Sequence, residues 1–187
     1  MKSNLREQPL KPSPAWNDVV EDDPTGPIDR FRWQYGFLSN FHPCVVQYGL
    51  HNYATVEAAY QAAKTFNLDD QHRIREAANP FIAKRLGQTV DIRPDWERVK
   101  RQVMAELLFQ KFIINVEFRQ KLLATDEREL IEGGVNDAYW GVDKYGHGQN
   151  HLGKLLMATR ALARLIVART TTVRTVSEDE SGVKRQV

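Results

Sequence analysis

Apolar and polar residues follow each other with the spacing of α-helices through most of the chain after residue 55. The longest apolar stripe begins after Asp95, a suitable N-cap, and continues to about Ile114. Further helices are predicted where such a stripe starts at a capping residue or ends at glycine or proline. They are expected over Val56–Phe66, 70–78, Pro80–Leu86, Asn115–Leu123 and from near Asn150 to about Ile166.

The stretch over residues 31–53 has a different pattern, in which aromatic and β-branched residues are interrupted by glycines. The segments 45–48 and 50–53 flank Gly49, so we expect them to pair as a short hairpin. Residues 129–132 alternate in the same way and form a candidate further strand. The pattern therefore predicts an α+β fold, a predominantly helical single domain with a small antiparallel sheet.

The two ends of the chain lack these patterns. Residues 1–27 hold five of the eight prolines and an acidic run, and residues 170–187 are polar without helical periodicity. Segments of such composition bury too little apolar surface to fold by themselves. We therefore expect flexible extensions over 1–27 and 170–187 around a folded domain over 28–169.

Composition narrows the classes of function. The net charge of +2 is weaker than the basic stripe of an obligate nucleic-acid binder. The one cysteine, Cys44, excludes an internal disulfide and a multi-cysteine metal site, and it fits a reducing, cytoplasmic compartment. No signal peptide or membrane span is expected, because the most apolar stretch, 155–168, is broken by arginines. We predict no metal and no cofactor, and the composition leaves the oligomeric state open.

Three places carry candidate chemistry, and the first is the helix that follows Thr55. Four polar side chains share one face of it: Glu57, Tyr60, Gln61 and Lys64. Alanines on the remaining faces would let other elements approach closely, so these groups would converge in a pocket. The alternative is a solvated polar stripe on a surface helix, with Glu57 interacting favourably with the helix dipole.

The second place is the run over 136–141. It joins an amide, a carboxylate and two large aromatic rings: Asn136, Asp137, Tyr139 and Trp140. An aromatic ring can stack on a base, and an aspartate can act as acid, base or ligand of a hydroxyl group. The alternative is that Trp140 fills the core and Asp137 is a turn residue.

The third place is the glycine-rich loop over 142–150, before the last helix. Gly146 and Gly148 would allow a ligand to approach the backbone, and free N–H groups at a helix N-terminus bind anions. Further contacts to a phosphate would come from Lys144, His147, Gln149 and Lys154. The alternative is an ordinary flexible loop in which Asn150 caps the helix.

Together these places resemble the NADAR domain family, also called YbiA-like. The family's blocks appear in order as FLSNF at 37–41, TVEAAYQAAK at 55–64, a W-x-x-V-x-x-x-V-M helix at 96–104, NDAYWG at 136–141 and GQNHLGKLLM at 148–157. The resemblance covers about residues 31–163. One departure is Ala58, which stands where many members have histidine.

The resemblance implies an N-glycosidase. Members of the family hydrolyse phosphorylated ribosylaminopyrimidine intermediates of riboflavin synthesis, or remove ADP-ribose from guanine. The expected partner is thus a small phosphorylated ribosyl substrate or ADP-ribosylated nucleic acid, and the sequence does not separate these two. On this basis the catalytic candidates are Glu57, Lys64 and Asp137. The binding candidates are Asn40, Gln61, Trp96, Asn136, Trp140, Gly141, Gly148 and Asn150.

Two mechanisms and two rival functions stay open. Glu57 and Asp137 could serve an oxocarbenium-like transition state, or a Lys64 of lowered pKa could attack the opened sugar as a Schiff base. One rival is a non-catalytic module that binds ADP-ribose or NAD-type ligands. The other is a structural helical protein in which Glu57 and Asp137 are exposed and far apart.

Overall fold

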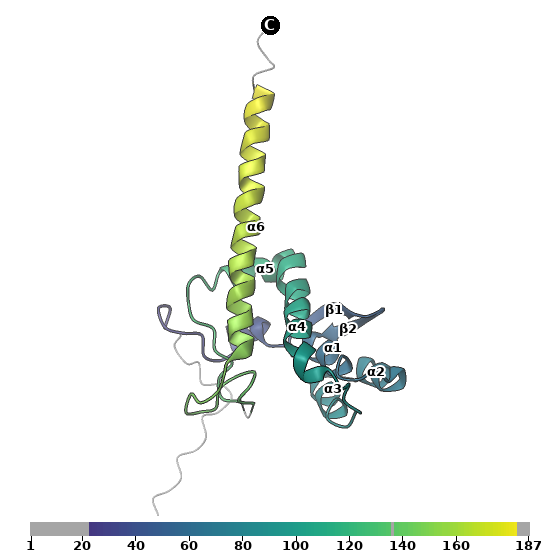
Figure 1. Ribbon diagram of the computed structural model, residues 1–187. Coiled ribbons are helices and arrows are strands. Elements are labelled where there is room, and N and C mark those ends of the chain that lie inside the picture. The colour runs from purple at the N-terminus through teal and green to yellow at the C-terminus, as the bar shows by residue number, and fades with distance from the viewer. Residues whose placement is uncertain (1–22, 136, 183–187) are drawn as a thin grey trace, which may run out of the picture.

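The computed structural model describes residues 23–135 and 137–182, and Figure 1 shows their arrangement. Helices make up about half of the chain, and the described residues also form one two-stranded antiparallel sheet. This composition confirms the predicted fold class. Of the predicted extension over 1–27, only 23–27 lie within the described residues, where a backbone hydrogen bond closes a turn between Asp23 and Gly26.

The predicted hairpin is present as β1 (Pro43–Tyr48) and β2 (His51–Thr55), with Gly49 in the left-handed region between them. Its inner face is apolar, because burial alternates along β1 and places Cys44 and Val46 inside. The predicted strand over 129–132 does not join this sheet. Leu130 makes only an isolated parallel bridge with Ile28, which places the 129–132 segment against the start of the domain.

The short helix α1 (Val56–Ala62) lies at the centre of the fold and is buried over its whole length. Thr55 caps it by accepting a hydrogen bond from the N–H of Ala58, as its sequence position predicts. The hairpin, α2 (Leu68–Arg75), α3 (Pro80–Leu86) and α4 (Trp96–Phe109) pack around it. Alanines make this close packing possible, since Ala59 and Ala62 are fully buried.

The predicted helix from Asp95 to Ile114 is observed as α4 followed by a π-helical segment, η2 (Gln110–Ile114). Asp95 does not cap α4 through its side chain, because its carboxylate binds the guanidinium of Arg93 at 2.6 and 2.8 Å. After η2 the chain turns at Asn115, whose side chain caps α5 (Val116–Leu123) as predicted.

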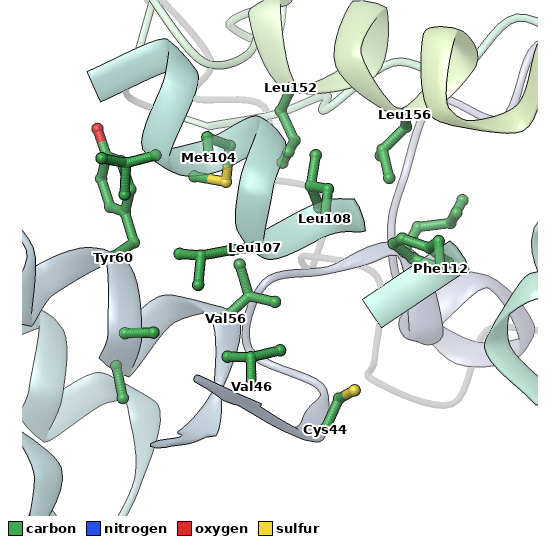
Figure 2. Packing of buried hydrophobic residues seen from close by; sticks show 14 of the residues in the cluster. Cys44, Val46, Val56, Tyr60, Met104, Leu107, Leu108, Phe112, Leu152 and Leu156 are labelled. Carbon is green, nitrogen blue, oxygen red and sulfur yellow. The ribbon is translucent and has the colours of Figure 1, made fainter. Parts of the chain in front are cut away.

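The core lies between α4, η2 and the first part of the last helix, α6 (His151–Gly182). Figure 2 shows Leu152 and Leu156 of α6 facing Leu108 of α4, while Val56 of α1 lies on the other side of α4. All four side chains are almost fully buried, so each contributes about 1.5–3 kcal/mol through removal from water.

Lys111 on η2 is a buried lysine behind this core. Its side chain has no exposed surface, and its Nζ donates a hydrogen bond to the carbonyl of Ser39 at 2.8 Å. Burial lowers the pKa of Lys111 to about 7. Because Ser39 begins the turn that leads to Asn40 and Phe41, this lysine fixes the main chain next to the cavity described below.

α6 differs from the prediction at its far end. It continues as helix to Gly182 through most of the segment over 170–187 that was expected to be a flexible tail, and it extends far beyond the rest of the domain in Figure 1. This also makes α6, and not α4, the longest helix of the described residues. Among those residues, no helix is both long enough and apolar enough to cross a membrane.

Candidate active site

A cavity of about 340 Å³ opens where α1, α3 and α4 meet the turn at 39–41 and the segments over 132–135 and 137–140. Most of the predicted site residues line it: Asn40, Glu57, Gln61, Lys64, Trp96, Asp137 and Trp140. Gly141, Gly148 and Asn150 do not line it, and Asn136 lies outside the described residues. A cavity of this size with convergent polar groups is typical of a site for a small molecule.

The polar face of α1 forms the floor of the cavity. Glu57 and Gln61 are only 6% and 4% exposed, and the amide of Gln61 donates to a carboxylate oxygen of Glu57 at 2.8 Å. The N–H of Glu57 donates to the carbonyl of Asn40 at 3.0 Å, which joins the helix to the 39–41 turn. The alternative of a solvated surface stripe is therefore wrong for α1, because Glu57, Tyr60 and Gln61 are all buried.

Burial perturbs both ionisable groups of this face. It raises the pKa of Glu57, against the hydrogen bond from Gln61 and the nearby positive charges. It lowers the pKa of Lys64, against the attraction of Glu57. A carboxyl and an amine are thus held together where neither is fully hydrated, an arrangement that favours proton transfer and nucleophilic chemistry.

Three aromatic rings form one wall. Tyr60 lies 5.0 Å from Trp96 and 5.6 Å from Trp140 between ring centroids. The indole N–H of Trp140 donates to the hydroxyl of Tyr60 at 3.1 Å, and burial raises the pKa of Tyr60. These contacts fix the half-buried ring of Trp140 beside the cavity, where it also packs against the core.

Asp137 is both a turn residue and a residue of the cavity. One of its carboxylate oxygens accepts the backbone N–H groups of Tyr139 and Trp140, each at 3.0 Å. The same carboxylate lines the cavity with Glu57, although the residue itself is exposed. The rival in which Glu57 and Asp137 stand far apart on the surface therefore conflicts with the structure.

The glycine loop over 142–150 does not offer the predicted anion site, because the N-terminus of α6 is already occupied. The backbone N–H groups of Gln149, His151 and Leu152 donate to the carbonyls of Ala138, Tyr139 and Trp140, at 2.7, 3.2 and 3.0 Å. No residue from 142–150 lines the cavity. The run over 137–141 thus acts as a backbone cap of α6.

The predicted binding residues of this region instead hold the main chain together. A Cβ on Gly141 would overlap the carbonyl oxygen of Glu132, and one on Gly148 would overlap the carbonyl oxygen of Gly141. Asn150, in the left-handed region at φ 47°, is buried, and its side chain hydrogen-bonds to the backbone of Leu130 and Glu132. The presence of Gly141, Gly148 and Asn150 in the recognised sequence blocks is therefore explained by the close packing of two loops.

Several residues of the cavity were not predicted as site residues. They include a carboxyl, two lysines and two aromatic groups: Glu132, Lys84, Lys100, Tyr60 and Tyr139. The Nζ of Lys100 lies 3.7 Å from the ring centroid of Tyr139 and 2.6 Å from a carboxylate oxygen of Glu97. Two of these residues gave a sequence signal, because Tyr60 shares the helical spacing of Glu57 and Lys64, and Tyr139 belongs to the aromatic run over 136–141.

Three buried acceptors from the lining residues have no hydrogen-bond partner in the described part of the chain. They are Asn40 Oδ1, Gln61 Oε1 and Glu132 Oε2. Buried polar atoms are normally paired, so a concentration of unpaired acceptors in one cavity indicates a ligand that donates, such as a sugar with hydroxyl groups. Within the same described residues, no group of histidine, cysteine or acidic side chains could hold a metal ion.

Comparison with known proteins yields a consistent set of matches. The family model described as NADAR domain matches residues 29–164. The chain is 38% identical to the N-glycosidase Npun_R5314 of Nostoc punctiforme, over 74% of this chain and 92% of that protein. It is 39% identical to the N-glycosidase YbiA of Escherichia coli K12, over 67% of this chain and 80% of that protein.

Two further comparisons extend this set. A protein of Vibrio vulnificus named riboflavin biosynthesis protein VVA0006 is 35% identical over 86% of this chain, which spans 40% of that longer protein. The NMR structure of the E. coli protein YbiA superposes with a TM-score of 0.67 at 35% identity, covering 78% of this chain and 89% of that chain.

Proposed function

Since the chain belongs to the NADAR domain family, we propose that it is an N-glycosidase that hydrolyses the ribose C1–N bond of a phosphorylated ribosyl compound. Relatives named N-glycosidases, at 38% and 39% identity, support this reaction. The observation that carries the proposal is the convergence of Glu57, Lys64 and Asp137 in one cavity walled by aromatic rings.

The chemistry of the bond explains why such groups are needed. When the C1–N bond breaks, positive charge develops at C1 of the ribose and electrons move to the departing nitrogen. Glu57 supplies a carboxylate near that charge, and Asp137 holds a ribose hydroxyl or activates the attacking water. The unpaired oxygens of Asn40 and Gln61 are suited to accept hydrogen bonds from ribose hydroxyls.

Other residues of the cavity are suited to bind the base and the phosphate of the substrate. Trp96 and Trp140 offer rings on which a base can stack. Because the backbone of the 142–150 loop is occupied, we assign the phosphate to Lys84 and Lys100, two cations that line the cavity from α3 and α4. Of the two substrate types, a ribosylaminopyrimidine phosphate is favoured by the Vibrio relative named for riboflavin biosynthesis.

Lys64 provides a second route to the same products. Burial lowers the pKa of Lys64, so its amine loses its proton more readily than an ordinary lysine, and it can add to C1 and form a Schiff base with the opened sugar. Borohydride reduces such an adduct to a stable secondary amine. Trapping during turnover and mapping of the adduct to Lys64 by mass spectrometry supports this route, whereas turnover without an adduct supports direct hydrolysis.

The proposal is tested by incubating the purified chain with two substrates, a ribosylaminopyrimidine 5-phosphate and DNA that carries ADP-ribosylated guanine. Release of ribose 5-phosphate from the first is expected, and release of ADP-ribose from the second identifies the other substrate type. Binding of either compound without release of a base, by protein that is folded and monodisperse, would overturn the proposed function.

A further inference from the structure

Glu132 is a third carboxyl group of the cavity, and its main chain is held on both sides. Its N–H donates to the side-chain oxygen of Asn150 at 3.1 Å, and its carbonyl accepts the N–H of Val142 at 2.9 Å. Its side chain packs against Gly141, where a Cβ would lie only 3.0 Å from the Cγ of Glu132. The side chain therefore points into the cavity from a fixed backbone.

One oxygen of the carboxyl group lacks the donor that an ionised group needs. Oε2 is buried and has no hydrogen-bond partner among the described residues. An unpaired buried carboxylate is costly, whereas a protonated carboxyl carries its own donor and no charge. The unpaired oxygen therefore favours a carboxylic acid, which is able to donate a hydrogen bond to a substrate bound in the cavity.

The charged groups around Glu132 shift its pKa in both directions. Glu57 on α1 and Asp137 in the adjacent loop oppose its ionisation, while Lys84 on α3 and Arg32 before the first helical turn favour it. Burial dominates and raises the pKa of Glu132 to about 7. Burial raises the pKa of Glu57 as well, but the two carboxyls differ in their partners, because Gln61 donates a hydrogen bond to Glu57 whereas Glu132 Oε2 has no donor among the described residues.

We propose that Glu132 is a further catalytic residue, the acid that donates its proton to the nitrogen leaving C1 of the ribose. This inference rests on the proposed N-glycosidase activity. It divides the work between two carboxyls with different partners. Glu57, which accepts a hydrogen bond from Gln61, is the anion that faces the developing positive charge, and Glu132, whose Oε2 lacks a donor among the described residues, is the neutral donor.

Proton transfer from Glu132 accompanies the breaking of the C1–N bond. The C1–N bond breaks, its electron pair stays on nitrogen, and the proton of Glu132 moves to that nitrogen, so that the amine leaves uncharged. Glu132 is then a carboxylate. Water adds to C1, directly or after Lys64, and loses a proton that restores the acid. The net reaction consumes one water and yields a free amine and ribose 5-phosphate.

Two substrates with different leaving groups test this role in the wild-type chain. A ribosylaminopyrimidine 5-phosphate needs a proton on its nitrogen, whereas nicotinamide mononucleotide releases neutral nicotinamide without one. We expect kcat/KM for the aminopyrimidine to fall as pH rises above about 7, where the acid is lost, and kcat/KM for nicotinamide mononucleotide to stay level there. The same fall with both substrates would contradict the role of Glu132.

The variant Glu132→Gln keeps the shape and removes the proton. We expect it to lower kcat for the aminopyrimidine by about 100-fold or more, to abolish the fall above pH 7, and to change cleavage of nicotinamide mononucleotide by less than about fivefold. Glu129→Gln, which changes an exposed carboxyl three residues away, is the matched control and should match the wild type.

The outcomes separate the two proposals. If the wild type releases ribose 5-phosphate from neither substrate, the proposed function itself fails. If the wild type cleaves the aminopyrimidine and Glu132→Gln does so at a similar rate, or at a lower rate with the fall above pH 7 retained, only the role of Glu132 fails. Should Glu132→Gln not fold, the comparison of the two substrates in the wild type decides alone.

Discussion

Asn150 joins the start of α6 to the backbone that carries Glu132. Its Nδ2 donates to the carbonyl of Leu130 at 2.9 Å, and its Oδ1 accepts the N–H of Glu132 at 3.1 Å. An asparagine suits this place because it tolerates the left-handed conformation that the residue adopts, at φ 47°. The position of a cavity carboxyl thus depends on an amide outside the cavity.

We therefore predict that Asn150→Ala lowers the free energy of unfolding by about 2–4 kcal/mol, because two buried backbone groups lose partners and the left-handed φ becomes strained. Urea denaturation followed by circular dichroism measures the loss. Asn150→Gly relieves the strain but not the lost hydrogen bonds, so it should fall between the wild type and Asn150→Ala. Equal stability of all three proteins would contradict the structural role of the amide.

Glu57→Gln should separate activity from stability. We expect kcat to fall by about 10²–10⁴-fold, because the charge that faces C1 is removed. Stability at neutral pH should stay equal or rise, since the raised pKa of Glu57 means that its ionisation opposes folding as pH increases. Steady-state kinetics and thermal denaturation at pH 7 measure the two effects, and a near-wild-type kcat would remove Glu57 from the catalytic residues.

Asp137→Asn should also lower kcat by about 10²-fold or more, because an amide cannot activate water. It keeps an oxygen that can accept the N–H groups of Tyr139 and Trp140, so the turn should persist. Near-ultraviolet circular dichroism, which reports on the Tyr60–Trp140 contact, checks the turn independently of activity. A spectrum altered as strongly as the rate would assign Asp137 a structural role alone.

The assignment of the phosphate to lysines of the cavity makes a test by substitution possible. Lys84→Met and Lys100→Met should each raise KM by about tenfold or more with a smaller effect on kcat, and weaken the salt dependence of kcat/KM. Lys154→Met is the matched control, because this exposed lysine belongs to the glycine-loop region and does not line the cavity. A larger rise in KM for Lys154→Met than for the two cavity variants would contradict this assignment and indicate that the glycine-loop region binds the phosphate.

The lowered pKa of the buried Lys111 makes the stability of the fold depend on pH. Its folded pKa of about 7 lies below the value of about 10.4 for a lysine in an unfolded chain, so the unfolded state binds more protons between these values. Stability should therefore rise with pH through this window. Relative to Lys111→Met, the wild type should gain about 2–3 kcal/mol between pH 7 and 9.5.

Urea denaturation at both pH values measures this gain. Lys121→Met serves as the control, because Lys121 is an exposed lysine on α5. The same pH dependence in the wild type and in Lys111→Met would show that Lys111 is not desolvated in the folded state.

Local patterns explain which parts of the fold could be predicted. Thr55 and Asn115 cap their helices, and Gly49 turns the hairpin, because these effects depend on a few neighbouring residues. The grouping of Glu57 and Lys64 is equally local, since Glu57 lies on α1 and Lys64 follows two residues after its end. Even so, the spacing alone could not distinguish a buried floor from a solvated stripe, and that choice depended on the elements that cover α1.

The residues that were missed come together only through tertiary packing. Lys84 and Lys100 lie on different helices, and Glu132 lies in a segment expected to be a strand. The glycine loop was misassigned for a related reason, because its spacing does not show that the carbonyls over 138–140 already accept the first N–H groups of α6.

The long α6 also makes the protein easy to label at one point. The described helix spans 32 residues, so its far end lies roughly 45 Å from its first turn beside the cavity. Cys44 is the one cysteine of the chain, and burial raises the pKa of its thiol, so it reacts slowly with alkylating dyes. A cysteine introduced at the exposed Leu165, roughly 20 Å along α6 from its first residue, would be the fast-reacting thiol and would anchor a fluorophore or a surface away from the cavity.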